Sequence, residues 1–231
     1  MPYRDTARPR VSHAATITSI CRLTPRMVRV TAAAESLVGV QIRPAQDIEL
    51  LLDDGDGPRV KRRYTVRRAR PDVGEIDVDV LVHGRGPGSR WASTTRPGDV
   101  MEFVGPRGKL ELRPADWHLF ACDEAGLPAI AALIEAIGRQ ATTLVLAEIG
   151  CSSDRLPLMA TSVRWLHRGQ DPAGTPALLE RQITGLCPPE GTGRAYLFGE
   201  SRVVAGLRGL MPALGLAPEG VFAKGYWNRR P

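Results

Sequence analysis

The chain of 231 residues contains little cysteine, and none of it forms a C-x-x-C pair. The four cysteines stand far apart, at Cys21, Cys122, Cys151 and Cys187. Such spacing argues against a structural zinc site and against the disulfide framework of a small secreted domain. We therefore expect reduced thiols in a cytoplasmic protein.

Histidine is equally scarce, and long apolar runs are missing. The four histidines, His13, His83, His118 and His167, show no spacing of metal ligands, so we expect no protein-bound metal. No apolar run is long enough to span a bilayer. The opening stretch "MPYRDTARPRVSH" has no apolar core of a signal peptide. We expect neither a membrane span nor a secretory signal.

Lysine contributes little to the positive charge, because only three lysines stand among the 31 basic residues. The formal net charge is +6, and seven basic residues lie between Arg59 and Arg70. A basic patch of this kind attracts nucleic acid, an anionic cofactor or an anionic substrate. No nucleic-acid-binding motif accompanies it, so we expect no nucleic-acid partner. A non-enzymatic barrel that binds an anionic ligand stays an alternative.

The first half of the chain consists of short segments rich in Val, Ile and Thr. Apolar and polar residues mostly alternate in them, which is typical of half-buried strands. Turn signals such as Thr24-Pro25 and Pro97-Gly98 separate the segments. Six strands without an intervening helix predict a closed antiparallel barrel. The strands are expected at 14–20, 26–32, 47–53, 62–68, 75–83 and 99–105, with one helical turn at 32–39.

From residue 117 onward, strand and helix patterns alternate. Segment 142–149 is a continuous apolar run, as in a strand buried on both faces, whereas 127–138 repeats apolar residues at helical spacing. This alternation predicts a parallel sheet with right-handed crossovers. The strands are expected at 117–122, 142–149, 162–168, 194–200 and 220–227, and the helices at 127–138, 176–186 and 203–214.

Pro114 and Asp116 interrupt both patterns. We therefore predict an N-terminal antiparallel six-stranded β-barrel domain over 1–113, followed by a parallel α/β domain over 114–231. One layout with this order binds a flavin against the barrel and a nicotinamide nucleotide at the carboxyl ends of the α/β strands. Domain order alone does not fix the function.

The stretch "RRYTVR" carries groups that suit a flat anionic cofactor. On a strand, Arg62 and Tyr64 share one face, and Arg63 and Thr65 share the other. An aromatic ring beside a guanidinium can stack on a flat ring system while the cation pairs with a phosphate. The alternative is a barrel strand with a core tyrosine and solvated arginines.

The stretch "HGRGPGSRWASTTRPGD", residues 83–99, follows a strand with a glycine-rich turn. A helix that starts at "GSRWAS" directs several backbone N–H groups to one point, where Ser89 adds a hydroxyl. That geometry suits a pyrophosphate, and the glycines admit phosphate oxygens where a Cβ would obstruct them. The alternative is a Gly-Pro turn above a buried Trp91.

The order of these segments resembles the signature of the siderophore-interacting protein family, flavin-dependent ferric-siderophore reductases related to ferredoxin-NADP reductases. The family has an R-x-Y-T-V-R strand, a strand that ends in His, then G-P-A-S-x-W-A and P-G-D. Here these read "RRYTVR" (62–67), His83, "GPGSRWA" (86–92) and "PGD" (97–99). The stretches "DEAGLPAI" (123–130), "WLHR" (165–168), "GE" (199–200) and "GYWNRR" (225–230) also resemble the family. The similarity covers nearly the whole chain.

The resemblance implies an FAD site in the barrel and a nicotinamide nucleotide at the α/β domain. The residues that it places around the flavin ring and a nearby phosphate are Arg62, Tyr64, Thr65 and Val66. Those of the pyrophosphate turn are Gly86, Gly88, Ser89 and Trp91, with His83 near the ribityl or adenosine part. Asp123, Glu124 and Ala125 are placed at the nicotinamide-side mouth, and Tyr226 and Trp227 over the flavin region.

Four positions depart from the family pattern. Gly88 replaces a common alanine, and Ala125-Gly126 replaces Thr-Ala, which removes a hydroxyl at the nucleotide mouth. Cys122 replaces a common glycine, and we interpret it as a small hydrophobic residue. NADPH, NADH and ferredoxin all stay open as donors, with Arg155 and Arg168 as candidates for neutralising a 2′-phosphate.

The activity that the resemblance implies is a reductase that passes electrons from NAD(P)H through FAD to a ferric siderophore and releases ferrous iron. The cofactor performs the difficult chemistry, so we expect no catalytic side chains and find no Ser-His-Asp set. The basic residues Arg59, Lys61 and Arg63 are expected to gather an anionic chelate. An alternative is the same flavoprotein fold acting as a tailoring enzyme on an organic substrate.

Overall fold

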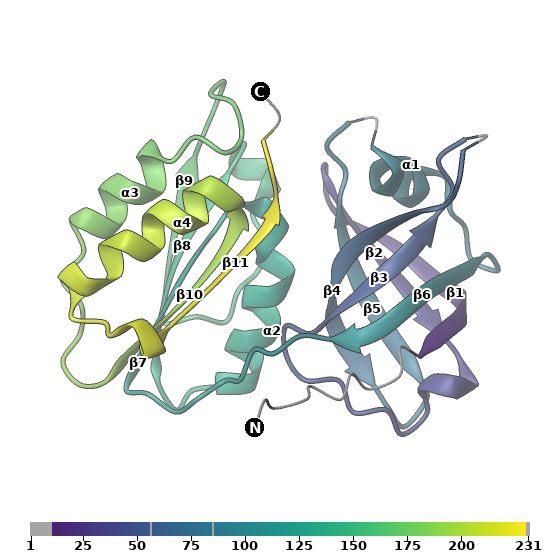
Figure 1. Cartoon of the computed structure of the whole chain (residues 1–231), viewed down its shortest axis with the longest axis horizontal. Coiled ribbons are helices and arrows are strands. Elements are labelled where there is room, and N and C mark those ends of the chain that lie inside the picture. Colours follow the sequence, from purple (N-terminus) through teal and green to yellow (C-terminus); the bar gives the residue numbers. More distant parts are fainter. Residues whose placement is uncertain (1–10, 56, 85, 230–231) are drawn as a thin grey trace, which may run out of the picture.

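The computed structural model describes residues 11–55, 57–84 and 86–229. Two parts lie side by side: a closed barrel from the N-terminal half and a parallel sheet with helices from the C-terminal half (Figure 1). This confirms the predicted fold class. Arg85, Arg230 and residues 1–10, which belong to stretches quoted above, lie outside the described residues. Within the described ranges, no helix is long and apolar enough to cross a membrane.

The barrel has six antiparallel strands in the order β1-β2-β5-β4-β3-β6, and β6 pairs with β1 to close it. They are β1 (Ser12–Thr24), β2 (Met27–Ala33), β3 (Asp47–Leu52), β4 (Val60–Arg70), β5 (Glu75–Leu81) and β6 (Val100–Arg107). Alternate residues such as Val28 and Val30 fill the interior. Strand β4 runs further than predicted because Arg70 pairs with Asp77 of β5, which extends the ladder through charged residues.

One helix, α1 (Pro87–Thr94), stands between β5 and β6 and lies at one end of the barrel (Figure 1). Ala92 is buried and Trp91 is partly buried against the barrel core. The helical start after the glycine-rich turn is therefore confirmed. The short helical turn predicted at 32–39 is the 3-10 helix η1 (Glu35–Leu37).

The second part is a five-stranded sheet in the order β11-β10-β7-β8-β9, and every neighbouring pair is parallel. The strands are β7 (Trp117–Cys122), β8 (Thr142–Ile149), β9 (Ser162–His167), β10 (Gly193–Glu200) and β11 (Val221–Trp227). The chain order reverses between β7 and β10. Ligands of such sheets bind where the order reverses, beyond the carboxyl ends of the strands.

Helices cover both faces of this sheet. Helix α2 (Leu127–Ile137) lies on the face toward the barrel, and α3 (Ala177–Thr184) and α4 (Ser201–Leu210) lie on the other face (Figure 1). Successive residues of β7 alternate between the two cores, with Phe120 beside α2 and Leu119 beside α4. The short 3-10 helices are η2 (Glu124–Gly126), η3 (Ser152–Asp154), η4 (Met211–Leu214) and η5 (Pro218–Gly220).

The single helix predicted over 203–214 is divided in two. Helix α4 starts earlier, because the Glu200 carboxylate accepts hydrogen bonds from the N–H groups of Arg202 and Val203 and caps the helix. It ends at Leu210, and η4 follows. Pro212 offers no N–H for an α-helical hydrogen bond, so the chain tightens at this point.

The chain passes from the barrel to the sheet between Arg107, the end of β6, and Trp117, the start of β7. We propose a domain boundary at residues 113 and 114, inside this connection. Contacts also cross the seam between the two parts: the buried Arg67 of β4 donates to Glu135 of α2 at 2.9 Å. Specific side-chain contacts therefore hold the barrel and the sheet together at this seam.

Candidate functional site

Strand β4 alternates as predicted. Tyr64 packs against the barrel core, and Arg62 is exposed with its guanidinium donating to the carbonyl of Lys61 at 2.9 Å. On the opposite face, Arg63 lies 3.4 Å from a Glu49 oxygen, and the Thr65 hydroxyl lies 3.1 Å from the hydroxyl of Tyr226 in the sheet part. The strand therefore presents one face to the barrel end and the other to the seam.

Val66 lies inside the barrel core. Its side chain is 3% exposed within the barrel core, and its N–H donates to the carbonyl of Gln46 at 2.9 Å. Both groups are used by the fold, and the place of Val66 at the flavin site stays a prediction. Its role is to anchor β4.

No described side chain caps the start of helix α1. Gly86 is the N-cap of α1 and forms no side-chain hydrogen bond there. The Ser89 hydroxyl instead accepts from the backbone N–H of His83 at 3.1 Å, which ties the exposed His83 to the helix. A Cβ on Gly86 would meet no atom within 4 Å. The helix start at Gly86 therefore borders open space, and no described side chain caps it.

Gly88, which we predict in the pyrophosphate turn, also packs directly on the barrel. A Cβ at this position would lie 1.7 Å from the Tyr64 hydroxyl oxygen and 3.0 Å from the ring carbon that bears it. The residue is a glycine because the Tyr64 ring packs directly against the helix start. Burial also raises the pKa of Tyr64 to about 12, so the phenol stays neutral.

Asp123 follows β7 at the point where the strand order reverses. Its carboxylate accepts hydrogen bonds from the Trp227 indole N–H at 2.7 Å, from the Ala125 N–H at 2.9 Å and from the Glu200 N–H at 3.0 Å. The side chain is buried, and burial raises its pKa to about 7. Asp123 thus holds the ends of β10 and β11 to η2.

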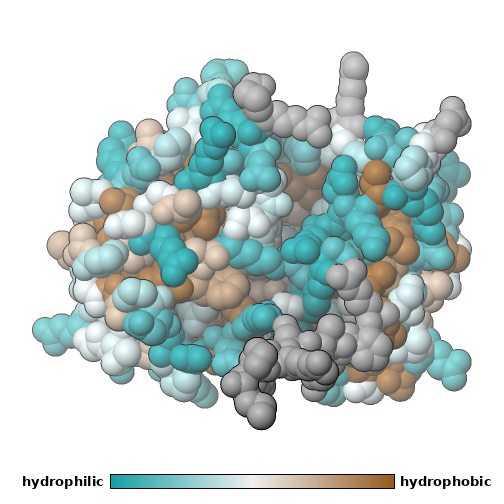
Figure 2. All heavy atoms as spheres, viewed as in Figure 1, coloured by the Kyte–Doolittle hydropathy of each residue, from teal (hydrophilic) through white to brown (hydrophobic). Residues whose placement is uncertain are grey.

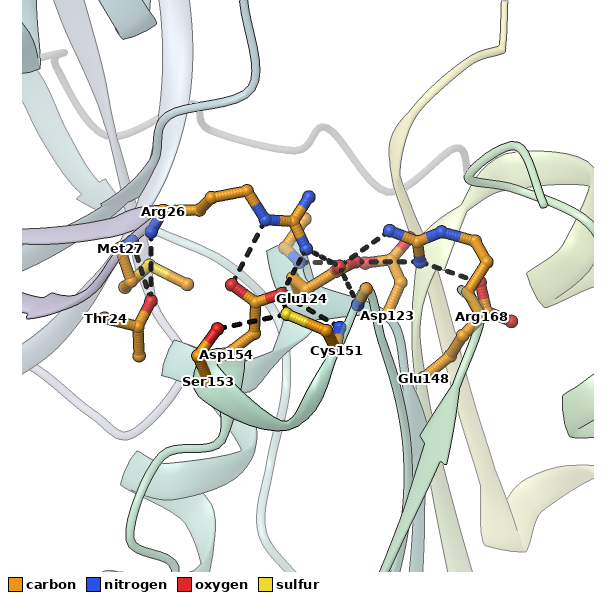
Figure 3. A network of polar contacts seen from close by, with 12 residues as sticks. Thr24, Arg26, Met27, Asp123, Glu124, Glu148, Cys151, Ser153, Asp154 and Arg168 are labelled. Carbon is orange, nitrogen blue, oxygen red and sulfur yellow. Dashed lines mark hydrogen bonds and ion pairs between the residues drawn. The ribbon is translucent and has the colours of Figure 1, made fainter. Parts of the chain in front are cut away.

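Glu124, the next residue, joins the two parts of the molecule. Its carboxylate accepts from Arg168 at 2.7 Å and from the backbone N–H of Gly150 at 2.9 Å (Figure 3). It also accepts at 2.5 Å from Arg26, which lies in the turn between β1 and β2 and pairs with Asp154 at 2.7 Å. Burial opposes the charged form, but the bonds and charges of both arginines outweigh it and lower the pKa of Glu124.

Arg168 is no longer a candidate for a 2′-phosphate. Its side chain is 6% exposed, and it binds Glu148 at 3.0 Å as well as Glu124. Burial raises the pKa of Glu148 although Arg168 opposes this. Arg155 is different: it is exposed, and its guanidinium lies 3.1 Å from the Nε2 atom of His167 at the end of β9.

The C-terminal strand closes the seam against the barrel. Besides the bond between Tyr226 and Thr65, Lys224 of β11 pairs with Asp47 of β3. Burial raises the pKa of Tyr226. The sequence suggested that Tyr226 and Trp227 lie near the barrel, but nothing in it marked Lys224, which pairs with Asp47 and lies over the Tyr226 ring. Nor did it mark the bonds from Arg26 to Glu124 and Asp154.

The expected substrate-gathering residues lie on the exposed surface of the barrel, at and just before the start of β4. Lys61 is exposed, whereas Arg59 pairs with Asp53 at 3.3 Å and with Glu102. Hydrophilic side chains gather over the barrel along the seam in this view (Figure 2). Part of the positive charge of β4 is thus balanced locally.

Two family models match this chain. The model of the siderophore-interacting protein family matches residues 115–230, and that of the siderophore-interacting FAD-binding domain matches residues 53–110. The chain belongs to the siderophore-interacting protein family. The family resemblance noted in the sequence is thereby confirmed. One matched region includes strand β4 of the barrel, and the other includes strand β11 of the sheet.

Individual relatives agree with this assignment. Ferric vibriobactin reductase ViuB of Vibrio cholerae is 34% identical over 74% of this chain and 65% of that protein. An NADPH-dependent ferric-chelate reductase of Escherichia coli is 30% identical over 68% of this chain and 62% of that protein. The chain thus spans less than two thirds of the length of these family members. A siderophore utilization protein from T. fusca superposes with a TM-score of 0.89 at 29% identity, covering 96% of this chain and 94% of that one.

Proposed function

We propose that this siderophore-interacting protein is an FAD-dependent reductase that passes electrons from NAD(P)H to the iron of a ferric siderophore. The observation that supports this proposal most directly is the contact region between the barrel and the sheet, the seam. It joins β4 to the C-terminal aromatic pair at the carboxyl end of a parallel sheet, and the uncapped start of α1 packs on Tyr64 of the same strand. The reductase names of two relatives support the same activity.

The barrel end fits the phosphates and the ring of FAD. The first turn of α1 has no capping side chain and borders open space at Gly86, which suits an anion that accepts from backbone N–H groups. Arg62 is exposed on the same strand face as Tyr64 and can pair with a phosphate. The residues that we propose to hold FAD are Arg62, Tyr64, Thr65, His83, Gly86, Gly88 and Ser89, with Trp91 supporting the turn.

When bound, FAD takes two electrons from a nicotinamide nucleotide and passes them on singly. The protein binds and orients the partners around it. Tyr226 and Trp227 close the seam from the sheet side, and the buried Thr65 hydroxyl fixes Tyr226 in place. No described acid or base needs to act on the substrate.

We propose NADPH as the donor, bound at the mouth formed by Asp123, Glu124 and Ala125. Arg155 follows β8 at the carboxyl edge of the sheet and, together with His167, offers an exposed polar pair for a 2′-phosphate. The named relative from Escherichia coli is NADPH-dependent, which supports this choice. Neither relative's name points to ferredoxin, and we do not carry that donor forward.

We propose that the ferric chelate docks beside the flavin over the exposed residues Arg59, Lys61 and Arg63. The iron arrives inside its chelator, because hard oxygen ligands hold the trivalent ion far more tightly than the divalent one. Electrostatic gathering of an anionic chelate weakens with salt, since the Debye length is about 8 Å at physiological ionic strength. We also propose a cytoplasmic location, where three exposed free thiols, Cys21, Cys151 and Cys187, stay reduced.

Flavin affinity of paired variants tests the cofactor site. Arg62→Ala removes a charge-assisted hydrogen bond worth roughly 1.5–3 kcal/mol, so FAD affinity falls by about one to two decades. Arg63→Ala is the matched control, because Arg63 points to Glu49 on the other strand face. Fluorescence titration of the flavin-free protein measures both. Equal losses, or tighter binding of FMN than of FAD, contradict the assignment.

A further inference from the structure

Three chain segments meet at the carboxylate of Asp123. One oxygen accepts from the Ala125 N–H in η2, and the other accepts from the Glu200 N–H at the end of β10 and from the Trp227 indole at the end of β11. A Cβ on Gly199 would lie 2.7 Å from the carboxylate, so β10 passes directly over it. No other described side chain joins these three segments through one group in this way.

The contact with Trp227 extends to the barrel through its neighbour. Tyr226 precedes Trp227, and its hydroxyl lies 3.1 Å from that of Thr65 on β4. The Tyr226 ring packs on the Phe198 ring, with centroids 5.4 Å apart. The Nζ atom of Lys224 lies over the Tyr226 ring, 5.2 Å from its centroid. A shift of Trp227 therefore moves the ring that touches the proposed flavin strand.

We propose that Asp123 is a positioning residue: its ionised carboxylate fixes the end of β11, and thereby Tyr226, against the barrel strand, and its protonation releases that end. The Asp123 proposal rests on the proposed function only where it predicts an effect on turnover. The structural coupling between Asp123 and Trp227 is a property of the chain alone. Asp123 belongs to the proposed nucleotide mouth, but its carboxylate is turned to Ala125, Glu200 and Trp227, so it acts here through Trp227 and Tyr226.

The hydrogen bonds explain why the ionised form is needed. All three partners are N–H donors, and a carboxylate accepts strongly from all of them at once. A protonated carboxyl accepts less strongly, and its O–H is an extra donor among three N–H groups, so the hold on these partners weakens. Burial favours the neutral form and brings the pKa to about 7, so the change falls in the physiological range.

Other titratable or charged groups surround Asp123. They are Cys122 and Glu124 on its own segment, Arg168 beside Glu124, Glu148 at the end of β8, Glu200 at the end of β10 and Tyr226 on β11. Burial raises the pKa values of Cys122 and Tyr226, so both stay neutral near pH 7, and the pKa of Glu200 is lowered. Glu148, whose pKa is raised, is the one group here that requires a separate control.

The direct test uses the protein without flavin. Indole N–H signals of the wild type are followed by ¹H–¹⁵N NMR from pH 5.5 to 8.5, and Trp227→Phe identifies the signal of Trp227. We expect this signal to titrate with a midpoint near 7 and to be pH-independent in Asp123→Asn. In Trp227→Phe, the Ala125 amide reports instead, and its midpoint rises by about one unit because the carboxylate has lost a donor.

Two controls keep the outcome decisive. Glu148→Gln retains the titration if Asp123 is the group, and its disappearance overturns the proposal. Asp72→Asn changes an exposed carboxylate in a barrel turn and leaves the midpoint unchanged. A Trp227 signal that does not move over this range, or that moves equally in Asp123→Asn, also overturns it.

The effect on turnover is measured by stopped-flow reduction of the FAD-loaded protein. The ionised fraction of Asp123 falls about tenfold from pH 8 to pH 6 for a pKa of about 7, and the reduction rate is expected to follow it. In Asp123→Asn this step is absent while FAD content stays the same. No reduction at any pH rejects the proposed function, and the NMR result still decides on the coupling. A wild-type rate that does not change with pH overturns the role in turnover.

Discussion

Arg168 offers the sharpest test of the network that joins the two parts. Arg168→Met keeps an unbranched apolar stem and removes the guanidinium and its charge. Two buried carboxylates, Glu124 and Glu148, then lose the guanidinium that binds them at 2.7 and 3.0 Å. All three side chains are at most 6% exposed, so water cannot replace the lost partner without a rearrangement.

The expected cost is large. Removing one partner of a buried ion pair typically destabilises by about 3–5 kcal/mol. For a chain of this size, each kcal/mol lowers Tm by roughly 2–4 °C, so a loss of about 6–20 °C is expected. Glu124 keeps Arg26 and the Gly150 N–H, which places the result toward the lower end.

The pH dependence adds a second signature. Without Arg168, burial raises the pKa of both carboxylates in the folded chain above their unfolded value. The folded state then holds protons that the unfolded state has released, so stability falls as pH rises through that range. The deficit of Arg168→Met relative to the wild type is therefore greatest at neutral pH and shrinks below about pH 5.

Thermal and urea unfolding of the flavin-free protein at pH 5 and pH 7.5 measure both effects. Arg96→Met, at an exposed position next to the Pro97-Gly98 turn, is the control and should change Tm little. Adding Glu148→Gln to Arg168→Met should recover part of the loss, because it removes one uncompensated charge. A loss below about 1 kcal/mol at pH 7.5, or a deficit independent of pH, refutes this account of the network.

Three further outcomes are expected. Gly88→Ala forces its Cβ onto the Tyr64 hydroxyl and should lower the free energy of unfolding by about 1–3 kcal/mol, measured by thermal unfolding. Adding Tyr64→Phe should restore part of this loss. An equal loss in the single and the double variant would contradict the packing. Burial and the charge of Arg194 lower the pKa of His118, so wild-type stability falls as pH drops below about 6.5. In urea unfolding, His118→Phe should reduce this fall. An unchanged dependence of stability on pH in the variant would argue against His118 as its source. Arg155→Ala should raise KM for NADPH several-fold and leave KM for NADH unchanged in flavin-reduction assays, and parallel effects on both would remove Arg155 from the site.

The sequence predicted the local structure of this chain well where periodicity is strong. The alternating Val, Ile and Thr segments became the six barrel strands, and the helical repeat at 127–138 became α2, because burial on one face selects the period. Errors occurred where one residue changed the geometry, as at Pro212, which divides the last helix.

The site was only partly predictable. The strand faces of Arg62 and Tyr64 and the helix start after Gly86 follow from local pattern. The bond between Thr65 and Tyr226 joins residues 161 positions apart, and Arg26 reaches Glu124 over 98 positions. No period or turn signal encodes such pairs, because they arise only when the two parts dock. The clash that fixes Gly88 is likewise a tertiary contact.

One measurement tests the central claim most directly. The purified, FAD-reconstituted protein is mixed anaerobically with NADPH or NADH, and a ferric siderophore and a ferrous-specific chelating dye are then added. The account predicts a bleached flavin spectrum, faster with NADPH, followed by reoxidation and by dye colour that matches the electrons delivered. A flavin that stays oxidised with millimolar nucleotide, or that is reduced but not reoxidised by any ferric chelate, would contradict it.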